Sequence, residues 1–226
     1  MVTFCLIHGQ WHDGASWDAV VDRVRARGHE ALAPDMPFDD PDADYAERAR
    51  PASQALAGAR DPVVVVGHSI ASAEAALVAA ERRPALLVYL CPRFGGFATP
   101  PGAPAIFREA FPFPARGADG RSVWTREAAI DVMYPRLPRD TAGALAERLR
   151  PGASAVGAYP LDEHPDVPTA LVYTTEDEFF TPEWERFVAR EILGVEPIAM
   201  PGGHFPMVER PDAVADLLDR LASSAV

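Results

Sequence analysis

The chain has 226 residues, 48% of them hydrophobic, which is enough to bury the core of one α/β domain but short for two independent domains. Its formal net charge of -12, from 21 basic and 33 acidic side chains, would repel a phosphate backbone or an anionic membrane surface, so nucleic-acid and membrane partners are not expected. All 21 basic residues are arginine. The absence of lysine excludes Schiff-base chemistry, pyridoxal phosphate anchoring and the phosphate-gripping lysine of a P-loop.

The N-terminal residues give no sign of export. Residues 2–7 form an apolar run with no basic stretch before it, which is typical of a strand rather than a signal peptide. Cys5 and Cys91 both lie in apolar runs, where a thiol behaves as a small hydrophobe, and no disulfide framework is indicated. No apolar run approaches the roughly 20 residues needed to span a bilayer. We expect a cytoplasmic protein, and the sequence leaves its oligomeric state open, a homodimer included.

Short apolar runs alternate with segments of helical period, which predicts a mostly parallel, doubly wound sheet of six strands covered by crossover helices. The strand candidates are residues 2–8, 30–34, 62–67, 85–90, 169–174 and 196–200. Several are apolar at nearly every position, as expected for parallel strands with both faces covered. The whole chain, 1–226, is therefore predicted to form a single α/β domain.

Three helices are predicted around this sheet. The first follows Ser16 as N-cap and stops at Gly28, and the last begins near Pro211. Both carry a single apolar stripe, which is typical of packing elements. Residues 70–83 are instead dominated by alanine, which allows a helix to lie close against central strands.

Residues 92–168 depart from the alternation. They contain no strong strand signal, many prolines and at least one helix, around residues 141–150. Segments of this length are not simple loops in a compact domain. The segment also carries scattered aromatic residues, which need something to cover, namely Phe94, Phe97, Phe107, Phe111, Phe113, Trp124, Tyr134 and Tyr159. We interpret it as a small, helical cap or lid inserted between two sheet strands.

Ser69 is the candidate nucleophile. The sequence Gly67-His68-Ser69-Ile70-Ala71 follows a buried strand and opens a helix, so it fits the nucleophile elbow G-x-S-x-G except that Ala71 replaces the last glycine. Small residues flank such a serine because larger ones would clash with the neighbouring backbone. Alanine is the mildest departure from the motif.

A nucleophilic serine needs a base that is oriented by a third group, and in the fold that carries a nucleophile elbow these follow in the chain order serine, acid, histidine. Among the six histidines, His204 alone lies in a turn between the last predicted strand and the last helix, where open α/β sheets gather their site residues. The acid should follow the strand at 169–174. There Glu176, Asp177 and Glu178 offer adjacent carboxylates that the residues alone do not distinguish.

Acyl transfer also needs donors directed at the oxyanion; in the fold that carries a nucleophile elbow they are two backbone N–H groups, one from the residue after the nucleophile and one from a loop after an early strand. Ile70 supplies the first. Gln10 is the predicted second donor, and Gly9 gives that loop room to approach Ser69.

Together these places resemble the α/β-hydrolase superfamily, and particularly its small-capped branch of bacterial esterases, plant methyl-ester esterases and hydroxynitrile lyases. Residues 7–17 look like the oxyanion loop of that branch, 173–177 like its acid loop and 201–207 like its histidine loop. The resemblance covers nearly the whole chain. It implies the α/β-hydrolase fold, a cap at 92–168, and a catalytic triad of Ser69, His204 and Asp177.

The same resemblance separates two chemistries within the branch. The lyases use a threonine after the first loop histidine and a lysine directly after the catalytic histidine, where this chain has Gly9 and Phe205. Ester hydrolysis is therefore favoured over cyanohydrin cleavage. Epoxide hydrolases and haloalkane dehalogenases have an aspartate at the place of Ser69, which argues against both. Cys91 and Pro92 stand where relatives often carry an aspartate.

We thus expect a serine esterase that cleaves a small, largely apolar carboxylic ester through an acyl-enzyme, without cofactor or metal. Its substrate pocket is expected under the cap and near the oxyanion loop, with an apolar lining of Trp11, Phe94, Trp124, Tyr134 and Phe205. Two alternatives stay open. One is a thioesterase or tailoring hydrolase of a biosynthetic pathway, which would need a basic landing patch such as Arg82, Arg83 and Arg93 for an acidic carrier protein. The other is a ligand-binding homologue without turnover.

Overall fold

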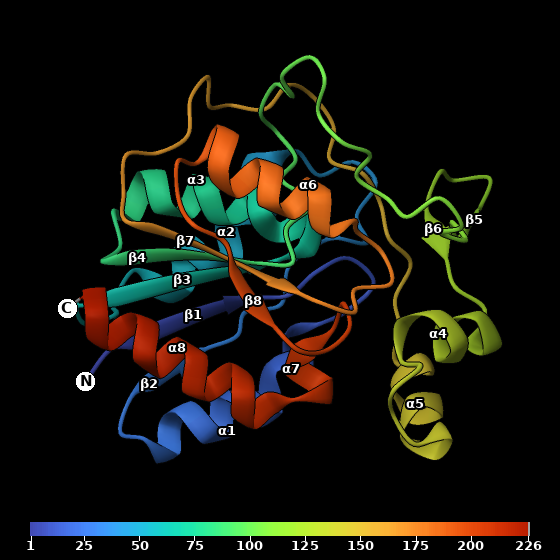
Figure 1. The fold of residues 1–226 in the computed structure, drawn as a ribbon, viewed down its shortest axis with the longest axis horizontal. Coiled ribbons are helices and arrows are strands. Elements are labelled where there is room, and N and C mark those ends of the chain that lie inside the picture. Colours follow the sequence, from blue (N-terminus) through green and yellow to red (C-terminus); the bar gives the residue numbers. More distant parts are fainter. Residues whose placement is uncertain (226) are drawn as a thin grey trace.

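The computed structural model describes residues 1–225 and has three layers, with a central sheet between two layers of helices (Figure 1). The sheet is parallel and six-stranded, in the order β2-β1-β3-β4-β7-β8. This confirms the predicted doubly wound fold. The strands are β1 (Thr3–Ile7), β2 (Glu30–Leu32), β3 (Val63–His68), β4 (Leu86–Leu90), β7 (Thr169–Thr174) and β8 (Ile198–Met200).

Helices cover both faces of the sheet, which is why its central strands are apolar throughout. One face is covered by α1 (Asp18–Ala26) and α8 (Pro211–Ala225), and the other by α2 (Tyr45–Leu56), α3 (Ser72–Arg82) and α6 (Pro182–Phe187) (Figure 1). Side chains of β3 alternate between the two cores: Val64 and Val66 belong to the first, and Val63 and Val65 to the second. The unbroken valine run therefore serves two cores at once.

The helices differ from the prediction in two respects. Ser16 is not the N-cap of α1, because a 3-10 turn (Gly14–Trp17) comes first and the Ser16 hydroxyl donates to the Asp13 carbonyl 2.8 Å away. The helix α2 was not predicted. Its signal is a capping box in which the Asp44 carboxylate accepts from the Glu47 N–H while the Glu47 carboxylate accepts from the Asp44 N–H.

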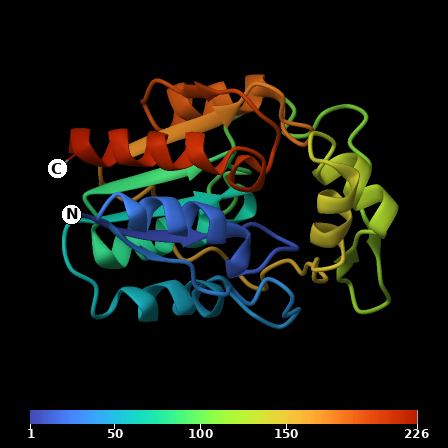
Figure 2. The same ribbon diagram turned by 90° about the horizontal axis from the view of Figure 1, so that it is seen from below.

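Residues 92–168 leave the sheet after β4 and return at β7. They contain α4 (Arg126–Met133), α5 (Arg139–Ala146) and an antiparallel pair of two-residue strands, β5 (Ala115–Arg116) and β6 (Ser122–Val123). The two short strands were not predicted. Figures 1 and 2 show these elements at the end of the molecule opposite the N-terminus, beyond the carboxyl ends of the strands. The function of this segment as a cap stays a prediction.

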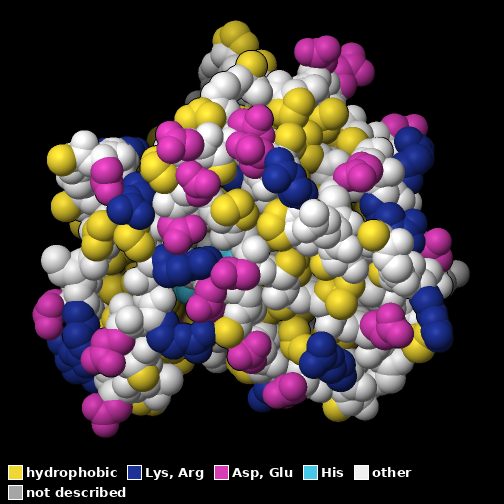
Figure 3. Space-filling view, turned by 180° about the vertical axis from the view of Figure 1, so that it is seen from behind, with side chains coloured by type: hydrophobic (Ala, Val, Ile, Leu, Met, Phe, Trp, Pro, Cys, Tyr) yellow, Lys and Arg dark blue, Asp and Glu magenta, His cyan; other side chains and the backbone are white. Residues whose placement is uncertain are grey.

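The surface mixes charges of both signs. On the face shown in Figure 3, acidic and basic side chains are interspersed rather than gathered by sign. Within residues 1–225, no helix is both long enough and apolar enough to cross a membrane.

Candidate active site

The turn after β3 holds Ser69 in a strained backbone conformation. Its φ of 56° lies in the left-handed region that non-glycine residues rarely adopt, and a 3-10 turn (Ser69–Ala71) leads from it directly into α3. Gly67 makes this turn sterically possible. A Cβ at that position would lie 2.5 Å from the Cβ of Ala75 and 2.9 Å from the carbonyl oxygen of Ala71. The strand-to-helix turn predicted from the motif is therefore present.

Three predicted side chains lie together at this turn. The Nε2 of His204 is 3.0 Å from the Ser69 hydroxyl, and its Nδ1 is 2.7 Å from the Asp177 carboxylate. The other oxygen of that carboxylate accepts from the backbone N–H groups of Phe179 and Phe180 at 2.6 and 2.9 Å. Because the carboxylate is held from both sides, it can orient the imidazole for proton transfer with the serine.

The structure distinguishes the three adjacent acids that the residues alone could not. Asp177 is buried and bonded to the His204 ring. Glu178 instead accepts from the backbone N–H of His204 at 3.1 Å and pairs with Arg136. Glu176 pairs with the same Arg136 guanidinium at 2.9 Å, at the surface. The two glutamates fix the loops, and the aspartate faces the site.

Other histidines lie close to the site and are structural. The ring of His68 donates from Nε2 to the backbone carbonyl of His204 at 2.8 Å, and burial lowers its pKa well below the ordinary value. The His12 ring is 2.7 Å from the Tyr134 hydroxyl, and burial lowers the pKa of His12 to about 4. His8 lies in contact with the backbone, with Nε2 accepting from the N–H of Met36. His12 and His68 are therefore neutral at pH 7 and add no positive charge beside His204.

Aromatic rings enclose the His204 imidazole. Phe179 stacks on it with ring centroids 4.3 Å apart and an interplanar angle of 4°. Phe180 and Phe205 approach it at near-perpendicular angles, each with centroids 4.8 Å away. Phe179 and Phe180 were not predicted as site residues. Their position directly after the acid loop was the available signal.

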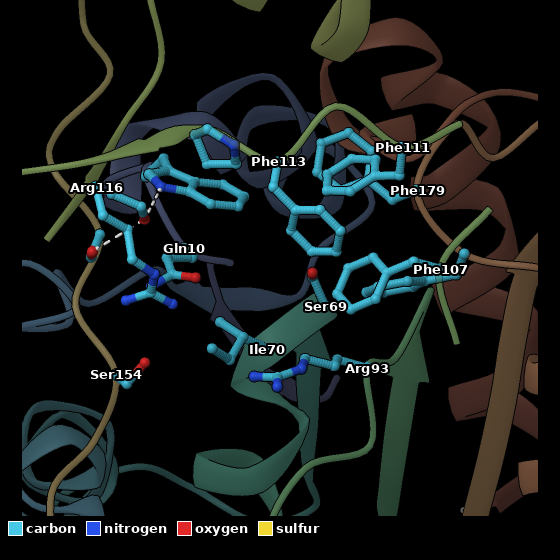
Figure 4. A pocket seen from close by; sticks show the side chains of 15 residues that line it. Gln10, Ser69, Ile70, Arg93, Phe107, Phe111, Phe113, Arg116, Ser154 and Phe179 are labelled. Carbon is cyan, nitrogen blue, oxygen red and sulfur yellow. Dashed lines mark hydrogen bonds between the residues drawn. The ribbon is translucent and has the colours of Figure 1, made fainter. Parts of the chain in front are cut away.

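Ser69 borders a cavity of about 170 Å³. Figure 4 shows two unlike sides: the rings of Phe107, Phe111, Phe113 and Phe179 gather on one, and Gln10, Ser154 and the guanidinium groups of Arg93 and Arg116 lie on the other. Phe180, Trp11, Ile70, Pro114, Ser122 and Gly152 complete the lining. The cavity thus offers an apolar region next to the serine and a polar region beside it.

The loop after β1, which carries the predicted oxyanion donor Gln10, is fastened to residues 92–168. The Gln10 side-chain amide donates to the Ala153 carbonyl at 2.7 Å, and the Trp11 indole donates to the Ser122 hydroxyl at 3.0 Å. The backbone N–H of Arg150 donates to the Trp11 carbonyl at 2.9 Å. Both Gln10 and Ile70 border the cavity beside Ser69. The loop and the inserted segment therefore form one wall.

The predicted apolar lining is largely different from the observed one. Trp11 lines the cavity, whereas Phe94, Trp124, Tyr134 and Phe205 do not. Phe94 is buried on the opposite face of the sheet, in the core beside α2 and α3. Trp124 packs behind Trp11, Tyr134 bonds to His12, and Phe205 packs on His204. Side-chain direction, which cannot be derived from the sequence, turns these four residues away from the cavity.

Cys91, Asp177 and His204 place possible metal-ligand atoms within 4.8 Å of one another. Their chemistry does not fit a metal centre. Burial raises the pKa of the Cys91 thiol well above its ordinary value, so it stays protonated, and its sulfur contacts the Thr174 hydroxyl at 3.5 Å. Asp177 and His204 are already bonded to each other.

Known proteins resemble this chain in sequence and in structure. The chain is 25% identical to a pyrethroid hydrolase of Sphingobium wenxiniae, in an alignment that covers 97% of this chain and 87% of the relative. The crystal structure of a pyrethroid hydrolase from Sphingobium faniae is similar, with a TM-score of 0.77 and 21% identity, and the match covers 99% of this chain and 98% of the hydrolase. The crystal structure of a methylesterase from Arabidopsis is also similar, with a TM-score of 0.76 and 17% identity. That match covers 99% of this chain and 100% of the methylesterase. Residues 6–217 match the description "Alpha/beta hydrolase family". With a match over nearly its whole length and with this strand order, the chain belongs to the α/β-hydrolase family.

Proposed function

We propose that this protein is a serine hydrolase that cleaves a small, largely apolar carboxylic ester through an acyl-enzyme. The observation that carries the proposal is the continuous series of contacts from Asp177 through His204 to Ser69, at the edge of an aromatic cavity. The names of the similar proteins, a pyrethroid hydrolase and a methylesterase, support ester hydrolysis.

The first half of the reaction acylates the serine. The Nε2 of His204 takes the proton from the Ser69 hydroxyl as Oγ attacks the ester carbonyl carbon. The backbone N–H groups of Gln10 and Ile70 stabilise the oxyanion that forms. When the tetrahedral intermediate collapses, the imidazolium returns the proton to the departing alcohol oxygen, and the acyl group stays on Ser69.

The second half removes the acyl group. His204 takes a proton from a water molecule as that water attacks the acyl carbonyl, and then protonates Ser69 as the carboxylic acid leaves. In both halves the imidazole becomes positively charged for a moment. Asp177 stabilises that charge at Nδ1, and the face of Phe179 offers a favourable quadrupole to the ring.

The cavity supports an apolar substrate because six of its lining residues are aromatic: Trp11, Phe107, Phe111, Phe113, Phe179 and Phe180. Three of them come from residues 92–168. We therefore assign this segment a role as a cap that covers the bound ester and excludes water from it.

The alternative of a carrier-dependent thioesterase gains nothing from the structure. Arg82 and Arg83 lie at the end of α3, which starts beside Ser69 and runs back toward the amino ends of the strands (Figure 1). Arg82 pairs with Asp61 and Arg83 donates to the Asp166 carbonyl, whereas Arg93 lines the cavity. The three arginines therefore do not form the landing patch that this alternative requires.

Hydrolysis of a panel of short 4-nitrophenyl esters, measured for the natural chain and for Ser69→Ala, tests the proposal. We expect turnover that Ser69→Ala abolishes, and covalent labelling of Ser69 by a fluorophosphonate in peptide mapping. Equal rates for both proteins, or label on another residue, would overturn the proposed mechanism.

A further inference from the structure

A second cavity of about 170 Å³ lies next to the first. The two share Ile70, Arg93 and Ser154, so they are neighbours across a common boundary. In Figure 4 these residues lie on the side of the first cavity away from the gathered phenylalanine rings. We call the second space the inner chamber; its remaining lining is Tyr45, Arg48, Ala73, Glu74, Gly95 and Ala155.

Two buried ionisable side chains line the inner chamber. Arg48 from α2 and Glu74 from α3 are each 1% exposed. Within the described residues 1–225, the Nε and Nη2 atoms of Arg48 and both carboxylate oxygens of Glu74 have no hydrogen-bond partner. Burial of an unpartnered polar group is unfavourable, and more so when the group is charged. Four such atoms at one cavity indicate a place where a ligand group completes the bonding.

The arrangement of the two side chains narrows the chemistry of that group. The charge of Arg48 acts on Glu74, but the two side chains do not hydrogen-bond to each other. Because both line the inner chamber, a group bound there can contact both. Arg48 offers only N–H donors, and the Glu74 carboxyl is purely an acceptor when it is ionised, that is, at a pH above its raised pKa of about 7. A group that satisfies both must accept from one side and donate to the other.

We propose that the inner chamber binds a neutral polar end of the substrate, a primary carboxamide or hydroxyl, while the ester carbonyl lies at Ser69. The proposal rests on the proposed function for the position of the ester. A wholly apolar end would leave the Arg48 and Glu74 atoms without bonds, and a carboxylate would face Glu74. A carboxamide oxygen accepts from Arg48 and its NH₂ donates to Glu74.

The test uses matched pairs of esters that differ at one end, a primary carboxamide in one and an isopropyl group of similar shape in the other. The variable end is placed on the acid in one series and on the alcohol in the second, because the structure shows the chamber but not which half enters it. At about pH 8.5, where Glu74 is ionised, we expect kcat/KM to favour the carboxamide at least about tenfold in one series, because its NH₂ donates to a charged carboxylate.

Glu74→Gln and Arg48→Met should each reduce that preference, the ratio of the two kcat/KM values, at least fivefold. Glu81→Gln is the matched control: Glu81 lies further along α3 and its carboxylate accepts from the Ser53 hydroxyl of α2, outside the chamber. It should leave the preference unchanged. Thermal unfolding of each variant checks that it folds. No preference in either series for the natural chain, or a preference that Glu74→Gln retains in full, overturns the proposal.

A binding experiment separates this proposal from the proposed function. In Ser69→Ala protein, calorimetry should show tighter binding of the carboxamide ester than of its isopropyl partner, with the difference lost on adding Glu74→Gln. Preferential binding together with no hydrolysis by the natural chain would reject the esterase and keep the inner chamber. Hydrolysis by the natural chain without any preference between the two esters would keep the esterase and reject the inner chamber as the binding site.

Discussion

The ring of Phe179 lies flat on the imidazole of His204, with centroids 4.3 Å apart and planes 4° from parallel. The backbone N–H of the same residue donates to Asp177 at 2.6 Å. One phenylalanine therefore touches the base with its side chain and fixes the acid with its main chain. This connection ties the positions of both groups to a single residue.

Replacing Phe179 by leucine should lower kcat about tenfold, because the leucine keeps the N–H donor to Asp177 but removes the ring that confines and electrostatically favours the imidazolium. Steady-state kinetics on a 4-nitrophenyl ester provide the measurement. Phe187→Leu is the control, since Phe187 packs against Trp184 and away from His204. An unchanged kcat in Phe179→Leu would show that the stacking has no role in turnover.

Asp177→Asn should lower kcat by about 10³–10⁴, because an amide can favour the wrong tautomer of the His204 ring. Ser69→Ala should reduce activity at least as far. Glu176→Gln changes a neighbouring carboxylate at the surface and should leave kcat within a factor of two. If Asp177→Asn kept most of its activity while Glu176→Gln lost it, the assignment of the acid would be wrong.

Gly152→Ala should disturb the oxyanion loop without unfolding the chain. A Cβ at Gly152 would lie 2.6 Å from both the Gln10 Cγ and the Trp11 Nε1, so those side chains must shift. We expect kcat to fall at least about tenfold, since removing one oxyanion donor altogether costs about 10²–10³ and displacing it should cost part of that. Gly58→Ala adds the same methyl group where nothing lies within 4 Å. Full activity in Gly152→Ala would indicate that the contact with residues 92–168 does not position Gln10.

The buried Glu74 predicts a pH dependence of stability. Burial raises its pKa from 4.5 to about 7. Between these values the unfolded chain ionises first, so the free energy of unfolding decreases as the pH rises from about 4.5 to above 7. Glu74→Gln removes this decrease. Its stability relative to the natural chain should therefore increase between pH 5 and pH 8, on the order of 2 kcal/mol.

Urea denaturation at the two pH values measures this difference. Other buried acids, such as Glu185 and Glu209, also have raised pKa values, but they occur in both proteins and cancel in the comparison. A difference between the proteins that does not change with pH would contradict a raised pKa for Glu74.

The sheet was predictable because parallel strands covered on both faces must be apolar at successive positions, as at residues 63–66. The position of Ser69 was predictable for a related reason, since a strand, a tight turn of small residues and an alanine-rich helix occur together there. Less could be said of α2, because Arg48 and Pro51 interrupt its apolar pattern. Its capping residues Asp44 and Glu47 were the better signal.

Side-chain direction was the part that the sequence did not contain. The predicted lining residues Phe94 and Tyr134 are aromatic and lie in the inserted segment, yet each faces a different neighbour. For the same reason the residues alone could not distinguish Glu176, Asp177 and Glu178, because the acid is the one whose carboxylate meets the N–H groups of the next turn. Arg48 and Glu74 gave no pattern at all, because only the packing of α2 on α3 brings them to one space.

The hydrogen bonds between the loop after β1 and residues 92–168 limit how this enzyme could acquire new substrates. Exchanging the inserted segment for that of a relative would also replace the partners of Gln10 and Trp11, namely Ala153, Ser122 and Arg150. A transplanted segment would thus alter substrate shape and reaction rate together. Variation confined to Phe107, Phe111 and Phe113, whose rings border the cavity without holding that loop, is the route by which specificity could diverge while the chemistry is kept.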